Sequence, residues 1–406
     1  MNIAEAINIS LSSIQANKLR SFLTLLGLII GVMTLILVMT IVQGANRYVE
    51  EKVADLGTNV FQISKTPVVV TDFQEYIKAQ RNKDLTVEDA EAIRQQCPDC
   101  LSVGIQLQAT STVKYGNESG EDTSIRGVTA NMAEISTINI EDGRYLSSFE
   151  EKNASPVCVL GRDVVDHLFP QVSPIGKILR ITNQEYRVIG VAERIGNVLG
   201  QSQDNFVLIP LNAFFKDFGS RRSVTIHVKA ANSERLEPAQ AQARTVLRSR
   251  RHIAYGSPDT FYIATAQTFL SVWASISSAF FMVFIMISSI ASIVGGIVIM
   301  NIMLVSVTER TKEIGVRRAV GAKRGDILWQ FLVEAMVQCI VGGLIGILLG
   351  FLLAVVVRQF TPFPTSVQIW VAATGFILST LIGIFFGIYP ARKAAALDPI
   401  EALRRE

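Results

Sequence analysis

The sequence contains few charged residues for its length. Only 18% of its 406 residues are Asp, Glu, Lys or Arg, whereas 49% are hydrophobic. Soluble globular domains typically carry about 25% charged residues, so this composition favours a membrane protein. The formal net charge of +3 gives no reason to expect a nucleic-acid partner.

Motifs for catalysis and metal binding are also missing. The three histidines form no H-E-x-x-H motif and lie at no metal-ligand spacing. No G-x-x-x-x-G-K-[ST] motif occurs, so these residues provide no phosphate-binding loop. We therefore expect no catalytic, cofactor-binding or metal-binding residues here, and we do not expect the chain to be an enzyme.

Long uncharged stretches predict four transmembrane helices. The first is too long for the hydrophobic region of a signal peptide, and no A-x-A-like cleavage site follows it. Three further stretches follow, and only Glu334 is charged within the third helix. We place the helices at residues 21–46, 271–308 (including an outer stalk), 327–357 and 367–390.

The distribution of Lys and Arg predicts the orientation. Basic residues cluster before the first helix, between the second and third, and after the fourth, which places both termini in the cytoplasm. Residues 47–270 then lie outside the membrane. The connecting segments are a cytoplasmic loop at 309–326, a short outer loop at 358–366 and a cytoplasmic tail at 391–406.

Residues 1–20 predict an amphipathic helix on the inner membrane face, because Ile3, Ile7, Leu11 and Ile14 recur at helical spacing. A cytosolic helix packed on the protein itself is the alternative.

At the other side of the membrane, Thr260–Thr308 would span about 73 Å as one helix, far more than the roughly 30 Å of a bilayer core. We expect a strand, a short turn and then a helix that continues outward as a stalk, matched by the first helix.

The outer domain is predicted to be α+β. Five segments rich in Val, Ile and aromatic residues are typical of strands: 60–64, 157–161, 185–193, 205–210 and 223–230. Two helices are expected at 84–96, with Thr86 as the N-cap, and at 232–250. Residues 65–83 and 114–124 are polar without clear periodicity, and we expect loops there.

Cys97 and Cys100 form the only closely spaced pair among four cysteines. We expect a structural disulfide in an oxidising compartment, although unpaired thiols remain the alternative. Cys158 and Cys339 lie in apolar segments and are expected to be core residues.

Glycines four residues apart occur in the predicted membrane helices, most clearly at Gly342, Gly346 and Gly350. This spacing allows close helix packing, within one chain or between chains.

Glu334 lies eight residues after Asp326, close to the cytoplasmic interface. A structural role there is favoured over a proton relay.

The loop "VTERTKEIGVRRAVGAKRGDI" has the pattern of a charged helix. Gly321 is expected to end this helix and Asp326 to cap the next. A solvated hairpin would account for the basic residues, but not for the interleaved acids or the apolar positions. We expect a helix presented to a partner through the apolar residues Ile314, Val316, Ala319 and Val320.

Three segments resemble MacB/FtsX-type ABC transporter permeases. They are "TERTKEIGVRRAVGAKRGDILWQFLVEA", the terminal "GIYPARKAAALDPIEALRRE", and the outer "PVCVLGRDVVDHLFPQVSPIGKILRITNQEYRVIGVAE". The resemblance implies a permease of the bacterial inner membrane that works as a homodimer. It implies that a cytoplasmic ABC ATPase binds the loop and that ATP-driven motion passes to the outer domain. The motif residues that would couple to the ATPase are Glu309, Arg310, Glu313, Gly315, Arg317, Arg318, Gly321 and Ala322.

The MacB members of this family carry an ATPase domain before the first membrane helix, whereas this sequence starts directly at the amphipathic helix. We therefore expect ATP and Mg²⁺ to be bound by a separate ATPase subunit. The large outer domain favours export of a drug, peptide or lipid-like cargo, with a periplasmic adaptor protein and an outer-membrane channel as further expected partners. The alternatives are an FtsX-like regulator of an outer partner, such as a cell-wall hydrolase, and a lipoprotein-release permease.

Overall fold

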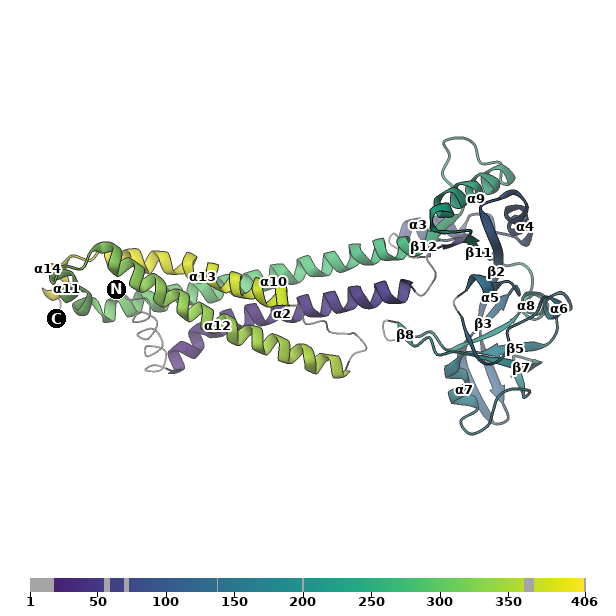
Figure 1. The fold of residues 1–406 in the computed structure, drawn as a ribbon, viewed down its shortest axis with the longest axis horizontal. Coiled ribbons are helices and arrows are strands. Elements are labelled where there is room, and N and C mark those ends of the chain that lie inside the picture. The colour runs from purple at the N-terminus through teal and green to yellow at the C-terminus, as the bar shows by residue number, and fades with distance from the viewer. Residues whose placement is uncertain are drawn as a thin grey trace. The chain divides into compact units, whose positions relative to one another are not determined.

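The computed structural model describes residues 18–54, 59–68, 73–136, 138–198, 201–360 and 369–404. The chain forms two compact units, one of residues 1–48 with 274–406 and one of residues 49–273 (Figure 1). Residues 1–17 of the predicted amphipathic helix lie outside the described residues, as do residues 361–366 of the short outer loop.

Four long helices dominate the first unit: α2 (Lys18–Ala54), α10 (Ala266–Glu309), α12 (Arg324–Phe360) and α13 (Ile369–Ala395). All four are long and apolar enough to cross a membrane. The short helices α11 (Thr311–Ala319) and α14 (Pro399–Arg404) follow α10 and α13. The prediction of four membrane helices, with an α+β domain between the first and second, is confirmed.

Helix α10 is longer than a membrane span requires. Its 44 residues extend over about 66 Å at about 1.5 Å per residue. The predicted strand before it is β12 (Tyr262–Thr265), but no turn separates the two elements. Instead, Thr265 Oγ1 accepts a hydrogen bond from the Thr268 backbone N–H at 3.2 Å, which caps the helix where the strand ends. The outer stalk itself stays a prediction.

The second unit is built on a ten-stranded sheet in the order β12-β1-β11-β2-β3-β10-β5-β7-β4, with β6 pairing with both β2 and β7. The other strands of this sheet are β1 (Val60–Ser64), β2 (Cys100–Tyr115), β3 (Glu118–Val128), β4 (Ile140–Gly143), β5 (Val157–Leu160), β6 (Ile178–Ile181), β7 (Gln184–Ala192), β10 (Phe206–Pro210) and β11 (Thr225–Ala230). A separate hairpin pairs β8 (Asn197–Val198) with β9 (Gln201–Ser202).

Short helices accompany this sheet. They are α3 (Phe73–Gln80), α4 (Val87–Gln96), α5 (Met132–Ile135), α6 (Ser148–Lys152), α7 (Arg162–Leu168), α8 (Leu211–Phe218), the 3-10 turn η1 (Ser233–Arg235) and α9 (Leu236–Arg250). The predicted N-cap of α4 is confirmed, because Thr86 and Asp89 form a reciprocal capping box.

Strands β5 and β10 are buried on both faces, which explains their uninterrupted apolar sequences. Along β10, Val207 and Ile209 belong to one hydrophobic core, whereas Phe206 and Leu208 belong to another. Successive side chains of a strand point to opposite faces, so the two cores lie on opposite faces of the sheet.

Two loop predictions were wrong. Residues 65–83 include helix α3, and residues 114–124 contain the end of β2, a turn and most of β3. The β2–β3 hairpin turns at Gly116, which has φ +58°, and its outer half is largely exposed. Its polar residues are therefore compatible with strands, because the cross-strand backbone hydrogen bonds hold them in place.

Candidate functional site

The charged segment after α10 folds as the helix α11, and its end is fixed by the backbone. Gly321 has φ +106°, a conformation that a residue with a Cβ rarely adopts. The Gly321 N–H donates to the Arg318 carbonyl at 3.2 Å, and the Ala322 N–H donates to the Arg317 carbonyl at 3.0 Å. This pair of bonds is a Schellman motif, so Gly321 ends the helix as the sequence predicts.

Helix α12 begins in a different way from the prediction. Asp326 was expected to cap the helix after Gly325, but α12 already starts at Arg324. The Asp326 carboxylate lies within the first turn and accepts a hydrogen bond from the Lys323 backbone N–H at 2.9 Å. A carboxylate in this position satisfies a free N–H and stabilises the positive end of the helix dipole.

Helix α11 is attached to α12 by two polar contacts. Arg310 lies 3.4 Å from the Glu334 carboxylate, and Arg317 Nη1 donates to Gln330 Oε1 at 2.9 Å. Glu334 and Gln330 are four residues apart on α12 and are 2% and 6% exposed. Between these contacts Ile314 packs into the core of the helical unit. Polar and apolar contacts together hold α11 at the base of α12.

The other face of α11 is exposed. Val316 and Val320 are 50% and 85% exposed, and Lys312, Glu313 and Ala319 also face outward. Val316 and Val320 lie four residues apart on one helix face, and neighbouring exposed apolar side chains are a feature of surfaces that contact another protein.

The prediction that Ile314 belongs to this exposed face was wrong, because Ile314 is only 1% exposed. The remaining motif residues vary in burial. Gly315 is buried, Ala322 is partly buried against the core, and Glu309 is exposed. Arg318 is half-buried, and its Nε has no hydrogen-bond partner among the described residues.

The C-terminal helix α14 packs against α11. Ala402 is buried, while Ile400 is exposed. The Asp398 carboxylate accepts a hydrogen bond from the Ile400 N–H at 2.8 Å and so caps this short helix. The charged segment that forms α11 and the C-terminal motif that includes α14 therefore lie next to each other. Their spacing along the chain could not show this.

Glu334 has a structural partner in Arg310, which agrees with the role favoured from sequence. Gln330 was not identified as a site residue. Its position four residues before Glu334 was the available signal, because residues at this spacing share a helix face. Without the fold, nothing indicated that this face of α12 would meet α11.

The predicted packing glycines lie against α2 of the same chain. A Cβ on Gly346 would lie 3.0 Å from the Ile29 carbonyl oxygen, and one on Gly350 would lie 2.9 Å from the Ile36 Cβ. The third glycine, Gly342, faces Leu25 and Leu28. The absence of a side chain at these positions lets the two helix backbones approach closely.

The structure joins Cys97 and Cys100 in a disulfide between the end of α4 and the start of β2. Cys158 and Cys339 are free and buried, and burial raises the pKa of the Cys158 thiol well above its usual range. Among the described residues, no group of three or more His, Cys, Asp or Glu side chains could hold a metal ion.

Comparison with known proteins connects these two units to one family. Residues 21–246 match the MacB-like periplasmic core domain, and residues 285–399 match the FtsX-like permease C-terminal domain. The chain is 33% identical over 404 residues to a macrolide export ATP-binding/permease protein MacB of Bdellovibrio bacteriovorus, a match that covers 99% of this chain and 62% of the relative. It is 30% identical over 406 residues to the uncharacterized ABC transporter permease YknZ of Bacillus subtilis, covering 100% of both.

A solved structure of the periplasmic region of MacB from Actinobacillus actinomycetemcomitans also resembles this chain, with a TM-score of 0.46, 19% sequence identity and coverage of 55% of this chain and 97% of that one. The chain spans about three fifths of the length of the MacB relatives.

The two family matches and the four long helices define a multi-pass permease of the inner membrane with a periplasmic-type domain. The chain belongs to the MacB/FtsX-type family of ABC transporter permeases, as the resemblance of its motifs predicted.

Proposed function

We propose that this permease couples ATP hydrolysis by a separate cytoplasmic ATPase to motion of its outer domain, and that this motion drives export. The proposal rests on how α11 is placed: one of its faces is exposed and the other is attached to α12. This helix exposes Val316 and Val320 on one face, while Arg310 and Arg317 attach it to α12. A force applied to the exposed face would therefore pass into a membrane helix.

The orientation belongs to the same proposal. The basic residues Lys312, Lys323 and Arg324 lie in or beside α11, and Arg392 and Lys393 lie near the end of α13. Clusters of Lys and Arg next to membrane helices favour the cytoplasmic side. We place both termini, α11 and α14 in the cytoplasm, and residues 49–273 outside the membrane.

The partner assignments rest on the relatives. YknZ, which this chain covers completely, is named as a permease alone, which supports an ATPase on a separate subunit that binds ATP and Mg²⁺. The names of the MacB relatives refer to macrolide export, which supports efflux as the outcome. We further propose a homodimer, joined by a periplasmic adaptor and an outer channel where a second membrane is present.

The coupling step can be tested by capture of the ATPase. The variant R317E/R318E reverses two charges of α11, and we expect it to lose the ATPase that copurifies with the unaltered chain. The matched variant R180E/R187E reverses two exposed arginines on β6 and β7 and should retain it. Equal capture by both variants would remove α11 from the proposal.

Export is tested separately. The chain and its ATPase are reconstituted in vesicles, and ATP turnover is measured with and without a macrolide such as erythromycin. A change in turnover, together with macrolide sensitivity of a deletion strain, supports efflux. If capture depends on α11 but no candidate cargo alters turnover or efflux, the coupling stands and export is wrong.

A further inference from the structure

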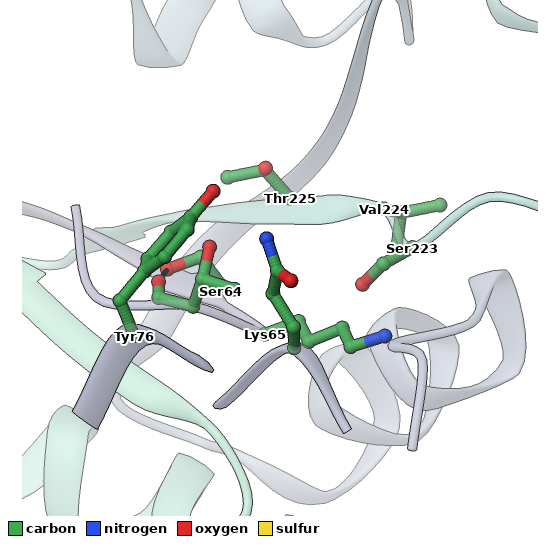
Figure 2. A pocket seen from close by; sticks show the side chains of 8 residues that line it. Ser64, Lys65, Tyr76, Ser223, Val224 and Thr225 are labelled. Atoms are coloured by element: carbon green, nitrogen blue, oxygen red, sulfur yellow. Dashed lines mark hydrogen bonds between the residues drawn. The ribbon is translucent and has the colours of Figure 1, made fainter. Parts of the chain in front are cut away.

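Two adjoining pockets occur in the outer domain, beside the ends of β1 and β11. The first has a volume of about 450 Å³ and is lined mainly by polar side chains. Figure 2 shows Tyr76 on one side of it and Ser223 with Val224 on the other, with Ser64 and Lys65 between them. The lining therefore offers hydroxyl groups and an ammonium group rather than an apolar wall.

The second pocket, of about 480 Å³, shares Lys65, Ser223 and Thr225 with the first. It extends along β2 to Gln106 and Gln108. Because the two pockets have three lining residues in common, they form one continuous polar surface. Each pocket by itself has a volume in the range of small-molecule sites, which are typically about 300–1,000 Å³.

The sheet register places Arg126 on the same face of the sheet as this surface, although Arg126 lines neither pocket. Thr225 pairs with Gln106 on the neighbouring strand, and Gln108 pairs with Arg126 on the next. Directly paired residues project from the same face of a sheet. The alternating residues Ile105 and Ile226 belong to one hydrophobic core, so these polar residues project from the opposite face, which also holds Val128 and Phe206 of the second core.

The lining of the second pocket has more cations than anions, because Lys65, Arg221 and Arg222 accompany a single carboxylate, Asp84. Asp84 lines the second pocket and lies 2.7 Å from Lys65, which neutralises that ammonium group. Arg221 and Arg222 line the same pocket and are exposed. Within the described part of the chain, no ion pair joins either arginine or Arg126 to a carboxylate.

Arg126 lies on the same face of the sheet but outside the two pockets. It is only partly exposed, its guanidinium lies 4.6 Å from the centre of the Phe206 ring, and its Nε has a hydrogen bond of 3.4 Å to Ser124. Burial lowers the pKa of the guanidinium, because a charge loses solvation away from water. A guanidinium group presents a planar fork of donors that fits phosphate or carboxylate.

We propose that the two pockets form one binding site for a small polar molecule that carries a phosphate or carboxylate group. The anion would lie between Arg221 and Arg222, and its polar body would contact the Ser, Thr, Gln and Tyr side chains. Sugar phosphates and acidic peptides both have this chemistry. The site requires no ATPase, so its test is independent of the proposed function.

Binding is measured by calorimetry on the full chain in neutral detergent, with four probes in two matched pairs. The pairs are glucose 6-phosphate with glucose, and triglutamate with triglutamine. We expect saturable binding of at least one anionic probe below about 10 mM and none of its neutral analogue. Which pair responds identifies the source of the anion.

Two double variants decide whether the pockets are the site. R221Q/R222Q should weaken binding by at least about tenfold, as expected for loss of charge-assisted hydrogen bonds. R180Q/R187Q, which removes two exposed arginines elsewhere in the same unit, should leave it unchanged. The proposal is overturned if no anionic probe binds, if glucose or triglutamine binds equally well, or if the two variants behave alike.

Discussion

Replacement of Glu334 by Gln tests how firmly α11 is attached to the membrane helices. The Glu334 side chain is 3% exposed and lies 3.4 Å from Arg310, whose side chain is 28% exposed. The substitution keeps the size of the side chain and removes its charge. Because the carboxylate is buried, Arg310 would lose a charged partner that water replaces only in part.

The exposure and the length of this contact set the expected loss in the free energy of unfolding. A hydrogen bond to a charged group contributes about 1.5–3 kcal/mol, and removal of one partner of a fully buried pair costs about 3–5 kcal/mol. The contact is long and Arg310 reaches solvent, so we expect a loss of about 1–2 kcal/mol for Glu334→Gln. Glu313→Gln is the matched control, since its pair with Arg317 is 51% and 37% exposed and should cost only about 0.3–0.5 kcal/mol.

The assay is reversible unfolding of the full chain in mixed detergent, with Arg310→Gln and the double variant completing a cycle. The cycle isolates the interaction between the two side chains, and we expect a coupling energy of about 1 kcal/mol. The reasoning is refuted if Glu334→Gln costs no more than Glu313→Gln. A coupling energy indistinguishable from zero would refute it equally.

Two further predictions follow from packing and charge. Gly346→Ala should destabilise the helical unit by about 1–3 kcal/mol relative to Gly325→Ala in detergent unfolding, because the new methyl group meets the α2 backbone at Gly346 and nothing at Gly325; equal effects would exclude close packing there. The hydrogen bond from Arg144 lowers the pKa of the Glu150 carboxyl from 4.5 to about 2. The ionised carboxylate therefore stabilises the folded state fully above pH 4.5, and this stabilisation is lost as the pH falls towards 2. In Arg144→Gln this acid-dependent loss should shrink, as measured by hydrogen exchange around Glu150; an unchanged pH profile would contradict the assignment.

The membrane helices and the end of α11 were predictable because their signals are local. Uninterrupted apolar sequence identifies a span whatever surrounds it. Gly321 identifies a helix end because only glycine readily adopts the required backbone conformation, and the structure places it at φ +106°. In both cases the structure that forms is decided by the residues of the segment itself and not by contacts with distant parts of the chain.

The β2–β3 hairpin was missed although Gly116 and Asn117, the two residues between its strands, are a local turn signal. Its outer half is polar and exposed, and it forms strands through pairing with neighbouring strands. Helix α3 was missed for a related reason, since Ala79 is its only fully buried residue. Phe73, Tyr76 and Ile77 recur at helical spacing, but eight residues are shorter than the window over which such periodicity is reliable.

The candidate coupling site was predicted as a list of residues but not as an arrangement. The sequence placed Ile314 on the face offered to a partner, whereas the fold buries it. Only the packing of α11 on α12 shows that Arg310 and Arg317 face inward to Glu334 and Gln330. Spacing defines a helix face, but tertiary contacts decide whether that face is inside or outside.

The central claim is that an ATPase acting on α11 moves the outer domain, and a distance measurement tests it most directly. Cys158 and Cys339 are buried and Tyr255 is fully exposed, so Tyr255→Cys provides a specific site for a spin label on each protomer of the proposed dimer. With the ATPase present, we predict that ATP shifts the distance between the two labels, and that R317E/R318E abolishes the shift. An unchanged distance, or a shift that persists in R317E/R318E, would contradict the account.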